Sequence, residues 1–256
     1  MRHARARIPL SACRAVACAL AGLGCVPARA EPVAAVVEMF TAQGCAACRT
    51  ADPVMRDLAR KPGILALTLP VTYWDYLGWH DTLGLRALTE RQRAYARARG
   101  ARQVVTPQAV VDGAQTTIGS NRPALERLLQ EAARTAPLSV PVSAEVQDSR
   151  IVVEVGARPS PKEPKPDTRD EVWLVPLLKA RDTTIETGEN RGRVASYVNV
   201  VRGLQRLGTW TGQPARFEVP LSAAAIPEAD GWVVLLQHSR EGRPGRILGA
   251  AKGPGL

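Results

Sequence analysis

Two cysteines separated by two alanines, Cys45 and Cys48, are the residues of this sequence with the most recognisable chemistry. The pair follows an apolar run and precedes an alanine-rich stretch, where a strand should give way to a helix. The free amides and the dipole of a helix N-terminus favour a thiolate, which is the nucleophilic form of cysteine. We therefore expect Cys45 to be the attacking thiol. Cys48, one turn further on and less exposed, would be the resolving thiol.

Other uses of this CxxC pair stay open on the sequence alone. Zinc usually takes four ligands, and only His80 and His238 accompany the pair in the chain beyond residue 30, so we disfavour a zinc site. Copper(I) accepts soft thiolates, so a copper carrier that uses the two cysteines and a histidine is an alternative. A quiet disulfide that only cross-links a loop is another. Apart from the copper alternative, we predict no cofactor.

The first 30 residues predict a leader that is removed from the mature protein. A basic start, an apolar middle and small residues at Ala28 and Ala30 are typical of a secretory signal peptide. A membrane anchor is disfavoured because Arg14 leaves an apolar run shorter than the roughly 20 residues that a span requires. A lipoprotein site at Cys25 is disfavoured as well. Cleavage after Ala30 would leave the CxxC pair as the last two cysteines, with one possible intramolecular pairing.

Removal of this leader would also halve the formal net charge. The segment contains five arginines and no acidic residue, so the charge falls from +10 to +5. The remaining basic residues are scattered among acidic ones, with no dense block, which argues against nucleic-acid binding. We predict a bacterial protein that is periplasmic or secreted and has no membrane span after cleavage. Its predicted partners are exported protein disulfides or thiols and a redox partner protein.

The elements that position the dithiol fall in residues 31–136, which we predict to be one domain. Hydrophobic periodicity and turn signals indicate strands at 34–40, 64–71, 104–111 and 116–119 and helices at 46–60, 89–99 and 123–133. Asp112-Gly113 is a turn dipeptide that joins the last two strands in a hairpin. The order β-α-β-α-β-β-α, with CxxC after the first strand, predicts a thioredoxin-like α/β domain.

Residues 137–256 predict a second domain that is rich in β-structure. Short β-branched runs recur at 138–146, 151–155, 172–178, 194–201, 216–219, 232–237 and 246–250. Several short strands with turn signals between them indicate a sandwich-like arrangement. The proline-rich, charged stretch 158–170 predicts an exposed loop.

Two positions near the dithiol in the predicted fold are candidates to assist it. Thr106-Pro107 falls inside a predicted strand, where proline is unusual. In thioredoxin-like domains a cis-proline in this strand faces the CxxC and leaves backbone free to bind an extended substrate, so we predict that role; an ordinary trans turn is the alternative. Glu38 interrupts an apolar strand, where a carboxylate must be paired or neutral. We predict that it exchanges a proton with Cys48, and a solvent-facing edge position is the alternative.

Aromatic residues gather in the segment 73–81, which holds four of the 11 Trp, Tyr and Phe residues of the chain. The segment follows the second strand, at the sheet end where the CxxC should lie. An apolar lip that binds substrate is one interpretation, with Trp74, Asp75 and Tyr76 as its candidate residues. Packing of the segment onto the second domain is the alternative, and we favour it slightly.

The densest polar cluster of the β-rich region is GENRGR, residues 188–193. Such clusters are usually hairpin turns, and that is our default interpretation. Glu189, Asn190 and Arg191 are weak candidates for binding a partner or an acidic group.

These motifs together resemble the bacterial secreted, thioredoxin-like proteins of domain of unknown function twelve-twenty-three. The matching segments, in chain order, are VVEMFTAQGCAAC, VTYWDYLGWHD, TERQRAYA, TPQAVVDG, GENRGR, NVVR and ILGAA. The resemblance implies an exported thioredoxin-like domain followed by a β-rich one, with no assigned activity. The family usually has proline after the second cysteine, where this chain has Arg49, and a basic side chain there favours a thiolate.

The function that the sequence favours is an exported thiol-disulfide oxidoreductase that works through a mixed disulfide. A partner-binding protein with a structural CxxC disulfide and a copper-handling protein remain the alternatives.

Overall fold

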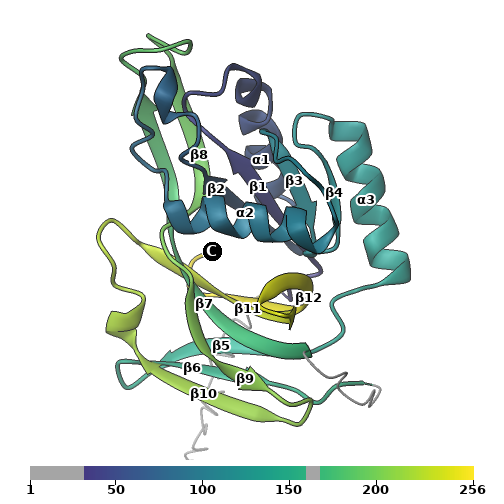
Figure 1. The fold of residues 1–256 in the computed structure, drawn as a ribbon. Helices are drawn as coiled ribbons and strands as arrows, with labels where there is room; N and C mark the ends of the chain where they lie inside the picture. Colours follow the sequence, from purple (N-terminus) through teal and green to yellow (C-terminus); the bar gives the residue numbers. More distant parts are fainter. Residues whose placement is uncertain (1–31, 160–167) are drawn as a thin grey trace, which may run out of the picture.

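The structure is a computed structural model that describes residues 32–159 and 168–256 (Figure 1). The expected signal peptide and most of the expected proline-rich loop lie outside the described residues. Within the described part, no helix is long and apolar enough to cross a membrane.

The strands form one mixed sheet of nine and a separate sheet of three. The large sheet has the order β12-β11-β7-β8-β2-β1-β3-β4, with β9 paired to β7 off this path, and the small sheet has the order β10-β6-β5. The strands are β1 Ala35–Thr41, β2 Ile64–Pro70, β3 Gln108–Val111, β4 Gln115–Ile118, β5 Val142–Gln147, β6 Arg150–Val155, β7 Thr168–Thr184, β8 Val194–Val201, β9 Gln205–Trp210, β10 Ala215–Pro220, β11 Gly231–Arg240 and β12 Arg243–Lys252. The helices are α1 Asp52–Ala59, α2 Arg86–Ala98 and α3 Arg122–Thr135, with short 3₁₀ helices η1 Ala46–Thr50, η2 Asp75–Leu77 and η3 Leu221–Ala223.

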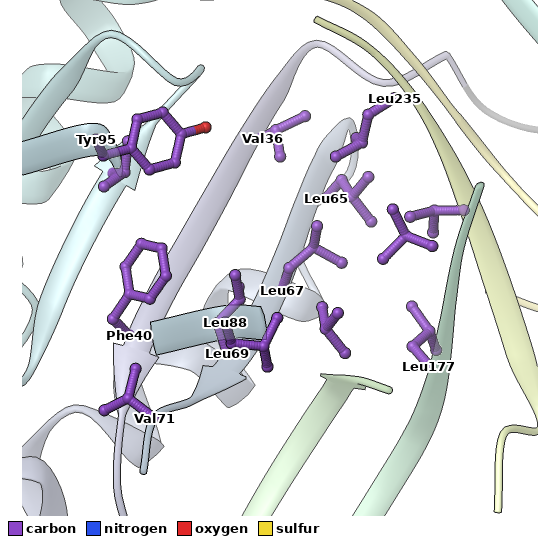
Figure 2. Close-up of a cluster of buried hydrophobic side chains, with 14 of the residues drawn as sticks. Val36, Phe40, Leu65, Leu67, Leu69, Val71, Leu88, Tyr95, Leu177 and Leu235 are labelled. Atoms are coloured by element: carbon purple, nitrogen blue, oxygen red, sulfur yellow. The ribbon is translucent and has the colours of Figure 1, made fainter. Parts of the chain in front are cut away.

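Helices cover both faces of the N-terminal part of the large sheet. Successive side chains of a strand point to opposite faces, so alternate residues of β1 meet different helices. Val37 and Met39 share a buried cluster with residues of α1 and α3. Val36 and Phe40 belong to another cluster, which includes Leu88 and Tyr95 of α2 and reaches β7 and β11 (Figure 2). This two-sided burial explains why apolar residues occupy consecutive positions on both sides of Glu38 in β1.

The predicted helix 46–60 is wrong as a single element, because a 3₁₀ turn precedes the α-helix. η1 ends at Thr50, and α1 begins at Asp52 with Pro53 in its first turn. Proline has no amide hydrogen and its ring clashes with the carbonyl four residues earlier, so an α-helix tends to start at proline rather than pass through it. The CxxC pair therefore lies at the start of the tighter helix and not in α1.

Two other boundaries also differ from the sequence prediction. The helix predicted from residue 89 begins at Arg86, and the hydroxyl of Thr89 accepts a hydrogen bond from the Thr72 amide at 3.0 Å instead of capping the helix. The strand predicted for 104–111 begins at Gln108, directly after Pro107. Proline cannot donate a hydrogen bond to a strand ladder, so the strand begins only after it.

The large sheet runs across the predicted domain boundary at residue 137. One end of the 17-residue strand β7 pairs with β11 and β9, and its other end pairs with β8, which lies parallel to β2. Two polar side chains extend the β2–β8 contact: Thr68 Oγ1 donates to the Val198 carbonyl at 2.6 Å, and Asn199 Nδ2 donates to the Ala66 carbonyl at 2.9 Å.

The three-stranded sheet packs against β7, β9 and β11 through a second buried cluster. Ile151, Val153, Trp210 and Trp232 are among its members. All seven strands predicted for this half are present, and β9 is an eighth that the sequence did not predict. Its residues QRLGTW carry a glycine and few β-branched side chains, which explains the weak signal.

The turn that joins β3 to β4 is anchored by Asp112. Its Oδ1 accepts a hydrogen bond from the Val36 amide at 2.7 Å, and its backbone is left-handed, with φ of 47°. At Gly113 an added Cβ would lie 2.2 Å from the Gly245 carbonyl oxygen, so glycine is required there. Asp112 Oδ2 is buried and has no hydrogen-bond partner among the described residues, and burial raises the pKa of this carboxyl to about 6.

Replacement of Asp112 by asparagine should remove a pH dependence of stability. The pKa of Asp112 is raised from 3.8 to about 6 on folding, so its contribution to the free energy of unfolding is full below pH 4 and is lost as the pH rises through 6. An asparagine side chain at this position would keep the Oδ1 acceptor, and asparagine suits a left-handed backbone.

The difference in the free energy of unfolding between D112N and the wild type should therefore shift in favour of D112N by about 1–3 kcal/mol when the pH rises from 4 to 7.5. Urea denaturation of both proteins at the two pH values measures this gain, and a constant difference would contradict the assignment.

Candidate functional site

The two cysteines form a disulfide where β1 leads into η1. Cys45 is the N-cap residue of η1 and Cys48 lies within it, with their Cα atoms 5.4 Å apart. The Cys48 amide donates to the Cys45 carbonyl at 3.1 Å, and the Ala51 amide donates to the Cys48 carbonyl at 2.9 Å. The predicted placement at a strand-to-helix junction is confirmed.

The predicted difference in exposure between the two cysteines is wrong, because Cys45 and Cys48 are each only 1% exposed. Trp74 belongs to the same apolar cluster, and an added Cβ on Gly44 would lie 3.4 Å from the Trp74 Cβ. The indole Nε1 of Trp74 donates to Thr106 Oγ1 at 2.7 Å. A hydrogen-bonded bridge between two loops thus packs beside the cystine, and both cysteines are almost fully buried.

Thr106 and Pro107 lie beside the dithiol, as predicted. The peptide bond between them is cis, so the trans alternative is wrong. The Thr106 carbonyl oxygen lies 3.7 Å from Cys45 Sγ. The structure therefore brings together Cys45, Cys48, Trp74, Thr106 and Pro107 from separate segments of the chain. Substrate binding by Thr106 and Pro107 stays a prediction.

Gln43, two residues before the first cysteine, is a residue that the sequence analysis did not select. It is fully buried, with 0% exposure. Its backbone amide donates to Asp81 Oδ2 at 2.7 Å. In its side chain, Oε1 accepts from Trp79 Nε1 at 2.7 Å and Nε2 donates to Thr82 Oγ1 at 3.1 Å. Its carbonyl accepts from Asn190 Nδ2 at 2.7 Å. Gln43 thereby connects the dithiol loop to two other loops.

The aromatic segment divides between the two roles considered for it. Trp79 contacts a buried cluster formed by residues of β7, β8 and their connecting loop, which agrees with the packing interpretation. Trp74 faces the dithiol through its contact with Thr106. Asp75 instead accepts from the Asp81 amide at 3.1 Å and pairs with His80. Tyr76 is 79% exposed.

The GENRGR cluster forms the hairpin loop between β7 and β8, and it does more than turn the chain. Asn190 is buried and points inward to the dithiol loop, so its prediction as a partner-binding residue is wrong. Arg193 forms an ion pair with Asp52, in the first turn of α1. Glu189 and Arg191 are exposed. We name residues 187–193 the clasp loop.

Asp52 is a buried carboxylate close to the dithiol. It is 5% exposed, and burial raises its pKa to about 6 although the Arg193 guanidinium lowers it. The carboxylate thus bears a desolvation cost that a single ion pair does not remove. Asp52 lies four residues after Cys48, so its ion pair with Arg193 connects the clasp loop directly to the segment that carries the cysteines.

Glu38 is buried, so the solvent-facing alternative is wrong. Its Oε1 accepts from Arg91 Nε at 2.6 Å and its Oε2 accepts from the Tyr95 hydroxyl at 2.5 Å. Burial raises the pKa of Tyr95, which keeps this hydroxyl protonated as a donor. Gln237 of β11 accepts a hydrogen bond from the Arg91 guanidinium at 2.8 Å through its Oε1, and its Nε2 donates to the Tyr95 hydroxyl at 2.6 Å.

The Glu38 carboxylate therefore joins β1 to α2 and β11. Both of its oxygens have partners on α2, and among the described residues no hydrogen bond connects Glu38 to either cysteine. Proton exchange with Cys48 stays a prediction that no contact in the structure supports.

The histidines considered for a copper site have other partners. His80 Nδ1 lies 2.7 Å from Asp75 Oδ2, and His238 Nδ1 lies 2.7 Å from Asp170 Oδ1. Within residues 32–159 and 168–256, no group of three or more His, Cys, Asp or Glu side chains is arranged to hold a metal ion.

Comparison with known proteins identifies relatives of this chain. The family described as "Protein of unknown function (DUF1223)" matches residues 36–237. Protein AGR_C_4864 from Agrobacterium tumefaciens has a similar crystal structure, with a TM-score of 0.74 and 32% identity over 87% of this chain and 94% of that one. HBP35 of Porphyromonas gingivalis is similar in fold, with a TM-score of 0.55 and 11% identity over 88% of this chain and 76% of that one. No curated protein matches.

Removal of the Asn190 side chain should loosen the dithiol loop. N190A leaves the buried Gln43 carbonyl without its donor, so the free energy of unfolding should fall by about 1–3 kcal/mol. E189A, at an exposed neighbouring position, is the control and should change it by less than about 0.5 kcal/mol. Urea denaturation followed by tryptophan fluorescence measures both, and equal values for the two variants would show that the clasp loop does not support the site.

Proposed function

We propose a function from the premise that this chain belongs to the DUF1223 family of proteins of unknown function. Since the family name assigns no activity, the activity has to come from the chemistry of the site. The chain is a thiol-disulfide oxidoreductase of the bacterial periplasm or exterior, and Cys45 and Cys48 are its redox centre.

The arrangement around the dithiol supports a thioredoxin-like N-terminal half. β1 and β2 are parallel, β3 is antiparallel to β1, and the sheet order there is β2-β1-β3-β4. α1 and α3 pack on one face and α2 packs on the other (Figure 1). The CxxC pair follows β1, and the cis-proline precedes β3.

The contact that carries the proposal is the one between the Thr106 carbonyl and Cys45 Sγ, at 3.7 Å. The residue before the cis-proline lies outside β3, so its backbone is not committed to the strand ladder. An extended substrate that bonds to this backbone would bring its own sulfur next to Cys45. An ordinary structural disulfide has no need of a residue outside the strand ladder at this distance.

The reaction is an exchange of disulfide bonds in two steps. A substrate thiolate attacks Cys45 Sγ, a mixed disulfide forms, and Cys48 leaves as a thiolate that takes up a proton. A second substrate thiolate then attacks the substrate sulfur of the mixed disulfide and releases Cys45 as a thiolate. The substrate dithiol is oxidised to a disulfide and the Cys45–Cys48 disulfide is reduced. The same steps in reverse reduce a substrate disulfide.

Access to the sulfurs requires a local opening, because both cysteines are buried. The hydrogen bond from Trp74 Nε1 to Thr106 Oγ1 is the contact that an incoming chain must displace. Its rupture separates the aromatic segment from the residue before the cis-proline and leaves most of the fold intact. Trp74 therefore acts as a gate, and substrate binding opens it.

A structural disulfide in a partner-binding protein is the competing function, and the burial of both cysteines favours it. The two functions differ in whether Cys45 ever bonds to another protein.

The substitution C48S separates these functions, because it removes the resolving thiol and should leave Cys45 in stable mixed disulfides with exported proteins. The control C45S should trap none. Non-reducing electrophoresis of periplasmic extracts, followed by reduction of the trapped species, measures the outcome. If C48S traps no protein and the wild type does not exchange with a synthetic peptide disulfide, the oxidoreductase proposal fails.

The substitution W74F tests the gate, because it keeps an aromatic ring and removes the indole donor to Thr106. Loss of a hydrogen bond worth about 1 kcal/mol should make reduction of the disulfide by dithiothreitol roughly three- to tenfold faster. Y76F, at the exposed position two residues on, is the control and should react at the wild-type rate. Stopped-flow thiol detection measures the rates, and equal rates for W74F and wild type would exclude Trp74 as the gate.

A further inference from the structure

A cleft lined by arginines lies at the C-terminal end of α2. Its walls come from α2 and from the segment 101–104, and they include Arg93, Arg97 and Arg102 but no acidic residue. A second surface cleft, on β4 and α3, offers a contrast, because Glu131 lies among its arginines. We name the first of these the arginine cleft.

The positive charge of the arginine cleft is only partly compensated. Arg93 pairs with Glu90 at 2.9 Å, and both side chains are 47% exposed. In the part of the chain that the structure describes, no carboxylate lies within 4 Å of the guanidinium of Arg97 or Arg102. Arg97 and Arg102 are both exposed.

Cations near a helix C-terminus are favourable by themselves, and this explains Arg97, in the last turn of α2. It does not explain Arg102, which lies beyond the helix and lines the same cleft. Guanidinium groups that line one cleft can each bind a carboxylate of the same ligand in a bidentate manner. This geometry indicates an anionic ligand.

The cleft is continuous with the proposed docking backbone. Residues 101–104, which line the cleft, are followed directly by Val105, which is 44% exposed, and by Thr106. The buried Gln92 of α2 fixes this connection, because its Nε2 donates to the Val105 carbonyl at 2.8 Å and to Gln108 Oε1 at 2.9 Å. Thr106 is four residues after Arg102, and four residues span at most about 14 Å of extended chain.

We propose that the arginine cleft binds an acidic segment of the substrate protein, with carboxylates about four residues away from the cysteine that reacts with Cys45. This inference rests on the proposed function in naming the occupant a substrate. The occupant is a peptide chain, because the cleft adjoins the backbone of Thr106, which lies outside the β3 ladder. Among the described residues, the lining of the cleft also has no aromatic side chain that could stack on a nucleic-acid base.

The test uses two cysteine-free, fluorescein-labelled peptides, one rich in glutamate and one with glutamine at the same positions. Fluorescence anisotropy with the mature full-length protein at about 50 mM salt should show tighter binding of the glutamate peptide, and higher salt should weaken it. The double variant R97Q/R102Q should lose about tenfold in affinity. The control double variant R127Q/R134Q, in the cleft on α3, should bind like the wild type.

Three results would overturn the inference. They are equal affinities for the two peptides, an equal loss in the control double variant, and tighter binding of a single-stranded oligonucleotide with the same dependence on Arg97 and Arg102. The last result would identify a nucleic-acid site.

Failure of this inference is separable from failure of the proposed function, because the anisotropy experiment needs no cysteine chemistry. Exchange assays with acidic and neutral peptide disulfides complete the test. R97Q/R102Q should raise KM about tenfold for the acidic peptide only and leave kcat unchanged. If C48S traps no protein while the glutamate peptide still binds through these arginines, the oxidoreductase proposal fails and the cleft remains a docking site for an acidic partner.

Discussion

The hydrogen bonds of Gln43 are the constraint on which the geometry of the site depends. A loop that is buried away from water must satisfy its polar groups internally, and Gln43 does so with one residue of the clasp loop and three of the segment 73–82. These partners fix the chain just before Cys45. These hydrogen bonds thereby also position the cystine next to Trp74 and Thr106.

The two halves of the chain are therefore joined through the loops around the dithiol. β8 continues the sheet beyond β2, so the clasp loop at its start lies next to the dithiol loop. A second connection, the buried group of Glu38, Arg91, Tyr95 and Gln237, joins β1 and α2 to β11 on the face of the sheet that α2 covers. The β-rich half thus contacts the N-terminal half at the dithiol loop and at Glu38 through its partners.

Much of this fold could be predicted because its signals are local. β-branched runs identified the strands around the dithiol, and the order of elements placed Pro107 opposite Cys45. What could not be predicted depends on residues far apart in the sequence. Asn190 reads as part of a turn, yet its partner Gln43 is 147 residues away, and the partners of Glu38 lie 53 and 57 residues along the chain. The burial of the cystine has the same origin, since Trp74 and Thr106 come from separate loops.

The reduction potential of the Cys45–Cys48 pair tests the central claim most directly, because a redox centre must exchange electrons with its surroundings and a structural cross-link need not. Equilibration of the purified protein with glutathione redox buffers, followed by alkylation and mass measurement, gives this value. The account predicts a reversible two-electron transition between about −120 and −270 mV, the range of known oxidoreductases. A pair that stays oxidised throughout, with a potential below about −300 mV, would contradict it.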